Sequence, residues 1–78
     1  MAFAEAMRDQ LTLERCLDEL GEALGVFEPY PPAVLAVALR VHLEALLQAL
    51  LEANVCVRAD VRAFVREFER EVLQYGAD

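Results

Sequence analysis

The sequence predicts an all-α protein: a three-helix bundle or helical hairpin with a highly apolar central helix, completed by oligomerisation. Three observations support this prediction. Apolar residues recur at helical spacing in the first and last thirds of the chain. The middle third is apolar on almost every side, and a proline-rich segment separates it from the first third. We expect a single helical domain over residues 1–78, because 78 residues suffice for one domain.

The first predicted helix covers residues 3–24. From Leu13 onward its apolar residues follow alternating steps of 4 and 3, which places them on one helix face, and the acidic residues fall mainly on the other. This apolar stripe consists of Phe3, Met7, Leu13, Leu17, Leu20, Leu24 and Phe27. We expect Gly25 to end the helix in the left-handed conformation, because glycine adopts it without a Cβ clash.

A stiff connector, Glu-Pro-Tyr-Pro-Pro, follows over residues 28–32. Proline cannot continue a helix, and each proline also pushes the preceding residue toward extended geometry. We interpret the segment as a turn between two helices, with Pro32 near the first helical position. A proline-rich ligand for an aromatic-lined groove is the alternative interpretation.

The central predicted helix covers residues 32–54. Arg40, Glu44, Gln48 and Glu52 form one polar stripe about 120° wide, and most of the remaining surface is valine, leucine and alanine. A helix that is apolar on nearly all sides is buried in protein or spans a membrane. Charges near the middle of this helix make a membrane span costly, so we expect no membrane partner.

The last predicted helix covers residues 58–75, after a short β-prone link. One face of this predicted helix is apolar. Another face carries four arginines at steps of four, which we call the arginine ladder: Arg58, Arg62, Arg66 and Arg70. The ladder predicts a solvated face; the alternatives are a contact with an acidic surface, in the same chain or in another, and a basic strip that binds phosphate or nucleic acid. Asp60 lies in the first turn, where a carboxylate stabilises the helix dipole.

The composition and charge limit the kinds of partner and the cell compartment that we expect for this protein. The net charge is −7, and residues 1–30 alone carry seven carboxylates against two arginines. An acidic surface repels nucleic acid and anionic membranes, so we expect no nucleic-acid partner. Cys16 and Cys56 are expected to be buried thiols, and no signal peptide follows Met1, which together favour a reduced cytoplasmic protein.

The residue types also argue against catalysis. The sequence contains no serine or lysine and only one histidine, His42, which removes the usual serine, Schiff-base and paired-histidine chemistries. We therefore expect no enzyme activity, no cofactor, no metal and no small-molecule substrate. By default, His42 hydrogen-bonds within a partly buried site; the alternative is a pH-sensitive residue at an interface.

The leading hypothesis is a small acidic module for protein–protein interaction: an adaptor, assembly factor or regulatory subunit. Its partner would be another protein or a second copy of the chain. The alternative hypothesis is an acidic inhibitor or nucleic-acid mimic that blocks a basic site on a nucleic-acid-handling protein. The candidate interface residues are Ala38, Val41, His42, Ala45, Leu46, Ala49, Leu50, Arg62 and Arg66.

Overall fold

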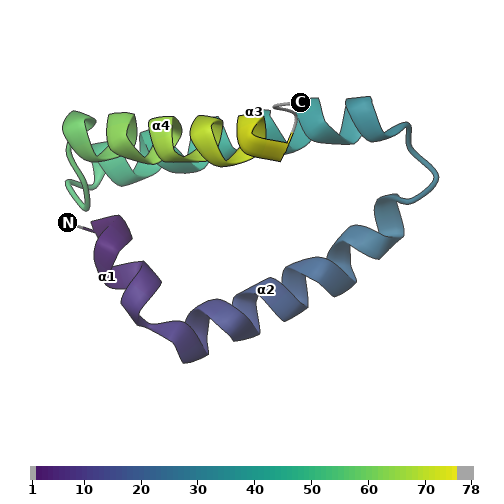
Figure 1. Ribbon diagram of the computed structural model, residues 1–78, viewed down its shortest axis with the longest axis horizontal. Helices are drawn as coiled ribbons and strands as arrows, with labels where there is room; N and C mark the ends of the chain where they lie inside the picture. Colours follow the sequence, from purple (N-terminus) through teal and green to yellow (C-terminus); the bar gives the residue numbers. More distant parts are fainter. Residues whose placement is uncertain (1, 76–78) are drawn as a thin grey trace.

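The computed structural model describes residues 2–75, which form four α-helices and one short 3-10 turn (Figure 1). The elements are α1 (Ala2–Arg8), α2 (Gln10–Leu24), the 3-10 turn η1 (Gly25–Phe27), α3 (Pro32–Glu52) and α4 (Arg58–Tyr75). No strand occurs among these residues, and the all-α prediction is confirmed. The expected helices over 32–54 and 58–75 correspond to α3 and α4.

The expected single helix over residues 3–24 is instead two helices that meet at Asp9. Asp9 leaves the helical conformation, with φ −83° and ψ 72°, and its side chain accepts a hydrogen bond from the Thr12 amide at 3.4 Å. Its own amide donates to the Glu5 carbonyl at 3.2 Å, which closes the last turn of α1. Aspartate is a preferred N-cap because its carboxylate satisfies an amide that the first turn leaves free. The new helix therefore starts in a different direction.

The predicted left-handed conformation of Gly25 is wrong. Its φ is −59°, and the chain continues into η1 and then into a further turn in which the Tyr30 amide donates to the Phe27 carbonyl at 3.0 Å. The prolines then redirect the chain, because Pro31 adopts an extended ψ of 136° and Pro32 begins α3. The connector therefore makes the predicted turn, with Pro32 at the first helical position.

The end of α3 is fixed by Asn54, whose φ of 60° lies in the left-handed region. The Asn54 amide donates to the Leu51 carbonyl at 3.1 Å, and the Val55 amide donates to the Leu50 carbonyl at 3.0 Å. These two bonds form a Schellman motif, which satisfies carbonyls that the helix end leaves free. α3 therefore ends at Glu52, two residues before the predicted boundary.

The start of α4 is fixed by Asp60, in the first turn. Its carboxylate accepts a hydrogen bond from the Val57 amide at 3.1 Å, just before the helix begins. This bond satisfies an amide at the helix N-terminus and places the carboxylate at the positive end of the dipole. Asp60 thus caps a backbone amide at the helix N-terminus, in addition to the dipole interaction that the sequence predicts.

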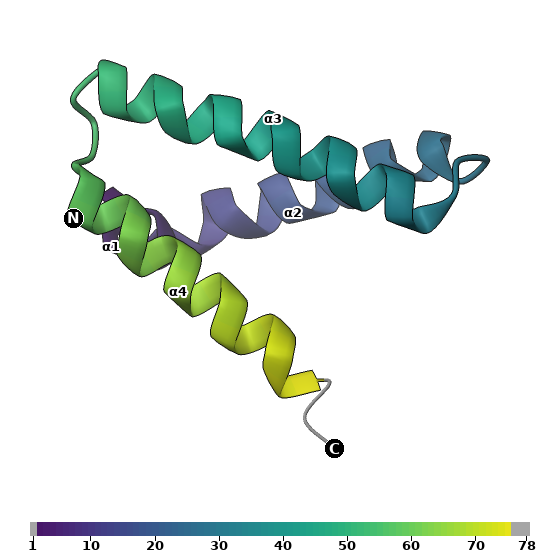
Figure 2. The same cartoon turned by 90° about the horizontal axis from the view of Figure 1, so that it is seen from above.

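The helices spread apart instead of closing into a bundle. α3 and α4 overlap in Figure 1 but diverge from the link at residues 53–57 in Figure 2. α1 contacts α4 near this link, whereas the main contacts of α2 are with α1 and η1, its neighbours in sequence. Among the described residues, only Cys56 is buried, with 5% of its surface exposed.

The radius of gyration and the accessible surface area are both larger than those of a compact domain of this size. The radius of gyration is 14.2 Å, compared with about 11.5 Å for a compact domain of this length. The accessible surface is 7022 Å², whereas a compact monomer of 8.7 kDa exposes about 4,700 Å². The chain thus exposes about 2,300 Å² more than a closed monomer of its mass would.

Substitutions at the α3–α4 link test the role of Asn54. We expect Asn54→Ala to lower the free energy of unfolding by about 1 kcal/mol, because a β-carbon without a polar group is strained at positive φ. Asn54→Gly should be neutral or stabilising. Urea denaturation measures both, and Ala53→Gly is the matched control, because Ala53 is right-handed and a glycine there should destabilise. Equal losses for Asn54→Ala and Asn54→Gly would contradict this explanation.

Candidate functional site

The apolar stripe of α2 is largely uncovered. Leu13, Leu17, Leu20 and Leu24 lie on one face at helical spacing, yet Leu17 is 57% exposed and Leu20 is 52% exposed. A helix of 15 residues is marginally stable in water unless its apolar face packs against something. In the described chain, α2 therefore gains little stabilisation from the packing of its apolar stripe.

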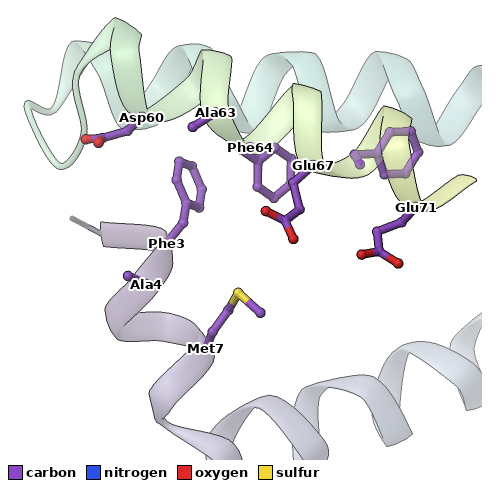
Figure 3. A pocket seen from close by; sticks show the side chains of 9 residues that line it. Phe3, Ala4, Met7, Asp60, Ala63, Phe64, Glu67 and Glu71 are labelled. Carbon is purple, nitrogen blue, oxygen red and sulfur yellow. The ribbon is translucent and has the colours of Figure 1, made fainter.

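A first groove lies between α1 and α4, with a volume of about 370 Å³ (Figure 3). Phe3 reaches across to Phe64, and their ring centroids are 4.8 Å apart. Such an aromatic pair contributes about 0.5–1.5 kcal/mol beyond the area that it buries. Met7 points into the same groove, and Glu67 and Glu71 line its edge on α4. The groove is thus an apolar channel with an acidic rim.

A second groove lies between η1 and the N-terminal half of α3, with a volume of about 240 Å³. Phe27 and Tyr30 form one wall, with ring centroids 6.3 Å apart. The other wall belongs to α3 and includes Ala38, Leu39 and His42. The groove therefore combines a mostly apolar lining with two side chains that can both donate and accept hydrogen bonds, the His42 imidazole and the Tyr30 hydroxyl.

A third groove of about 270 Å³ separates α3 from α4. Leu43 and Leu47 of α3 face Phe64 of α4 across it. Its rim includes Arg40 and Glu44, whose side chains form an ion pair at 3.3 Å. The polar stripe predicted for the central helix therefore begins beside α4, and its charges neutralise each other.

The candidate interface residues of α3 fall into one main group. Ala38, His42, Ala45, Leu46 and Ala49 lie within an arc of about 100° on α3, on the side away from α4, and all five are exposed. Val41 lies beside this arc and is also exposed, whereas Leu50 lies between the arc and α4 and is half-buried. The arc continues into the second groove, in which Phe27 and Tyr30 form the opposite wall.

The other candidates, Arg62 and Arg66, are exposed on α4 and far from this arc in sequence. Within residues 2–75 the ion pairs are Arg40–Glu44 and Arg70–Glu67, the latter at 3.0 Å. The arginine ladder therefore makes no ion pair with the acidic face of α2 in the described chain. Exposed pairs within one helix contribute only about 0.3–0.5 kcal/mol, so these charges do not hold the fold together.

Both cysteines are free thiols. Cys56 is buried in the α3–α4 link, as predicted, but Cys16 is exposed on α2, contrary to the prediction. Among the described residues, no three cysteine, histidine or acidic side chains cluster with the geometry of a metal site.

Three aromatic residues belong to the candidate surface although the sequence did not single them out as site residues. Phe27 and Tyr30 complete the groove on α3, and Phe3 connects α1 to α4. Phe27 ends the apolar stripe of the first helix, and Tyr30 is the only aromatic residue among the prolines. The sequence shows both of these positions, but it does not show the turn that brings the two rings to α3.

α3 is long and apolar enough to cross a membrane, with a mean hydropathy of 1.8 over its most apolar stretch. The Arg40–Glu44 pair lies near the middle of this helix. Charged groups at the centre of a membrane span each cost about 2.5–3.5 kcal/mol. Insertion of this helix into a membrane would therefore be penalised by the Arg40–Glu44 pair.

Comparison with protein-family models, with curated proteins and with solved structures finds no match for this chain. The exposed helix faces and the three grooves therefore carry the functional inference. Their common chemistry is apolar, with charged groups at the edges. Exposed apolar surfaces of this kind are found at sites that bind protein, membrane or small ligands.

Thiol chemistry tests the placement of the cysteines. We expect Cys16 to react rapidly with a thiol reagent in the native protein, and Cys56 to react only as the α3–α4 link opens. Mass spectrometry after timed labelling measures the two rates, and labelling in urea gives the control in which both thiols are accessible. Faster modification of Cys56 than of Cys16 would contradict the described burial.

Proposed function

We propose that this protein is a small, acidic, helical module for protein–protein interaction, acting without catalysis as an adaptor, assembly factor or regulatory subunit. The observation that carries the proposal is the uncovered apolar surface of α2 and α3 in a chain whose only buried described residue is Cys56. Exposed apolar area of this extent is unfavourable in water and favours association.

The proposal includes the architecture of the assembled state. A bundle forms when another chain supplies the missing helix faces, so α2, α3 and α4 become parts of a shared core. The surplus surface of about 2,300 Å² per chain supports this completion. The two free thiols and the acidic surface are consistent with a reducing cytoplasm and with a protein partner rather than nucleic acid.

A matched pair of charge substitutions on α2 tests the proposal. Leu17→Glu places a carboxylate on the apolar stripe, whereas Gln10→Glu adds the same charge at an exposed position in the first turn. We expect Leu17→Glu to abolish the assembly that the natural chain forms and Gln10→Glu to preserve it, because only the first desolvates a charge on association. Native mass spectrometry of complexes isolated from cells that express each variant measures the composition.

The opposite result is well defined. A natural chain that sediments as a compact monomer at high concentration, melts cooperatively and is isolated alone from cells would overturn the proposed function. Loss of assembly in both variants would show that added negative charge, and not the apolar stripe, controls association.

A second candidate function is an acidic inhibitor that blocks a basic site on a nucleic-acid-handling protein. The observation that favours it is the row of exposed carboxylates on α2, Glu14, Asp18 and Glu22, which form no ion pair among the described residues. α2 carries four carboxylates and one arginine. Such a row attracts a basic surface, and the attraction weakens as salt screens the charges.

Salt dependence separates this candidate from the apolar module. With an arginine-rich synthetic peptide as the probe, we expect binding to weaken at least tenfold between 50 and 500 mM salt, on the order expected for several screened charge contacts. Charge-neutral replacement of the three carboxylates with Gln, Asn and Gln should remove most of this dependence. Binding that is independent of salt would count against the inhibitor.

A further inference from the structure

The groove between α1 and α4 has an apolar wall and an open end. α1 contributes only uncharged residues to it, Phe3, Ala4 and Met7, and the phenylalanines Phe64 and Phe68 of α4 complete the apolar part. Phe3 and Phe64 are half-buried, whereas Met7 is 65% exposed and Phe68 is 58% exposed. The groove therefore closes near the α3–α4 link and, farther along α4, offers an aromatic ring and a flexible thioether to an incoming apolar side chain.

The charged residues that line this groove are all acidic in the described chain. Asp60, Glu67 and Glu71 lie within an arc of about 40° on α4 and extend over about 16 Å of its axis. No arginine lines the groove among the described residues, although Arg70 pairs with Glu67 at 3.0 Å. Glu71 makes no ion pair within residues 2–75. An uncompensated negative charge therefore stands at the open end, opposite the α1 wall (Figure 3).

We propose that the groove between α1 and α4 binds a basic amphipathic helix of a partner protein. Its apolar side chains contact Met7 and Phe68, and its lysines or arginines face Glu67 and Glu71. The inference rests on the proposed function and names the chemistry of the partner. A helix that docks in an apolar groove presents anchors at every third or fourth position, and basic residues one turn apart match two carboxylates that are themselves four positions apart.

Charge selects this occupant over a second copy of the chain. No helix among the described residues is net basic: α1 carries one carboxylate and one arginine, α2 four and one, α3 two and one, and α4 four and four. A second copy, with its net charge of −7, would bring like charge to an acidic rim. A helix rich in lysine or arginine is instead attracted to that rim.

A synthetic peptide provides the probe. It is about 18 residues of leucine, lysine and alanine, with the leucines on one helix face and the lysines on the flanking faces. We expect the full chain to bind it at least tenfold more tightly than a peptide of the same composition in scrambled order, because only the first presents a continuous apolar face. Fluorescence anisotropy measures both dissociation constants. Equal affinity for the two peptides would show recognition of charge alone and overturn the inference.

A matched pair of charge reversals on α4 tests the acidic rim. Glu69 and Glu71 are both exposed, but they point about 160° apart, and only Glu71 lines the groove. We expect Glu71→Lys to raise the dissociation constant of the amphipathic peptide at least tenfold, since attraction becomes repulsion, and Glu69→Lys to change it by less than about threefold. Circular dichroism checks that both variants keep their helices. Equal effects would show that total charge controls binding and would overturn the groove as the site.

A second pair tests the apolar wall. Met7→Gln removes an apolar contact from the groove, whereas Leu11→Gln makes the same kind of change at a residue that is 81% exposed and lines none of the three grooves. We expect Met7→Gln to weaken binding of the amphipathic peptide at least fivefold and Leu11→Gln to change it by less than about twofold. Unchanged affinity in Met7→Gln would contradict the proposed contact.

Photo-cross-linking locates the bound peptide without any substitution in the protein. A photoreactive residue replaces one leucine of the probe, and mass spectrometry of the digested adduct identifies the linked segment. We expect linkage to residues 3–7 and 60–71, which line the two walls of the groove. Linkage confined to residues 10–24 would place the peptide on the acidic helix α2 and overturn the inference.

The outcomes distinguish this inference from the proposed function. A complex isolated from cells that is unchanged by Glu71→Lys and by Met7→Gln would overturn the groove as the docking site and leave the interaction module intact. A homodimer of the natural chain that dissociates in Glu71→Lys but not in Glu69→Lys would assign the groove to a second copy and overturn the basic partner. A compact, cooperative monomer that is isolated alone and does not bind the peptide would overturn both.

Discussion

The structure depends on one constraint: α3 is apolar on more sides than its own chain covers. α4 approaches the side that carries Leu43 and Leu47, and η1 approaches the first turns through Phe27 and Tyr30. The remaining side stays in water. Because burial of apolar area is the largest favourable term in folding, the exposed side of α3 contributes none of the stabilisation that its composition could supply.

The two connectors explain why the chain does not cover α3 alone. The prolines fix the backbone before α3, and the left-handed Asn54 with its Schellman bonds fixes the backbone after it. Each connector therefore sets the direction in which the neighbouring helix leaves. α4 stays near α3 at the link and diverges from it farther along, and α2 makes its main contacts with α1 and η1, so much of the apolar surface of these helices remains exposed.

The three long helices differ in their charge. α2 is strongly acidic, α3 has one internal ion pair and few other charges, and α4 balances four arginines with four carboxylates. The exposed arc of α3 carries no fixed charge, whereas α2 and α4 carry their charged side chains on exposed faces. These charges favour solubility and affect which molecules can approach the chain.

The sequence by itself determined the helical class, the central position of α3 and the proline-rich turn before it, because hydrophobic periodicity and proline act through local backbone geometry. It also contained a residue that could break the first helix, since aspartate is a preferred N-cap, but the apolar stripe favoured one continuous helix. The candidate residues Ala38, His42, Ala45, Leu46 and Ala49 shared one face by helical spacing alone. Only the tertiary structure decided that this face lies away from α4, that Phe27 and Tyr30 border it, and that Cys16 is exposed. These features depend on the directions in which the helices leave the connectors. The spacing of residues within one helix carries no information about those directions.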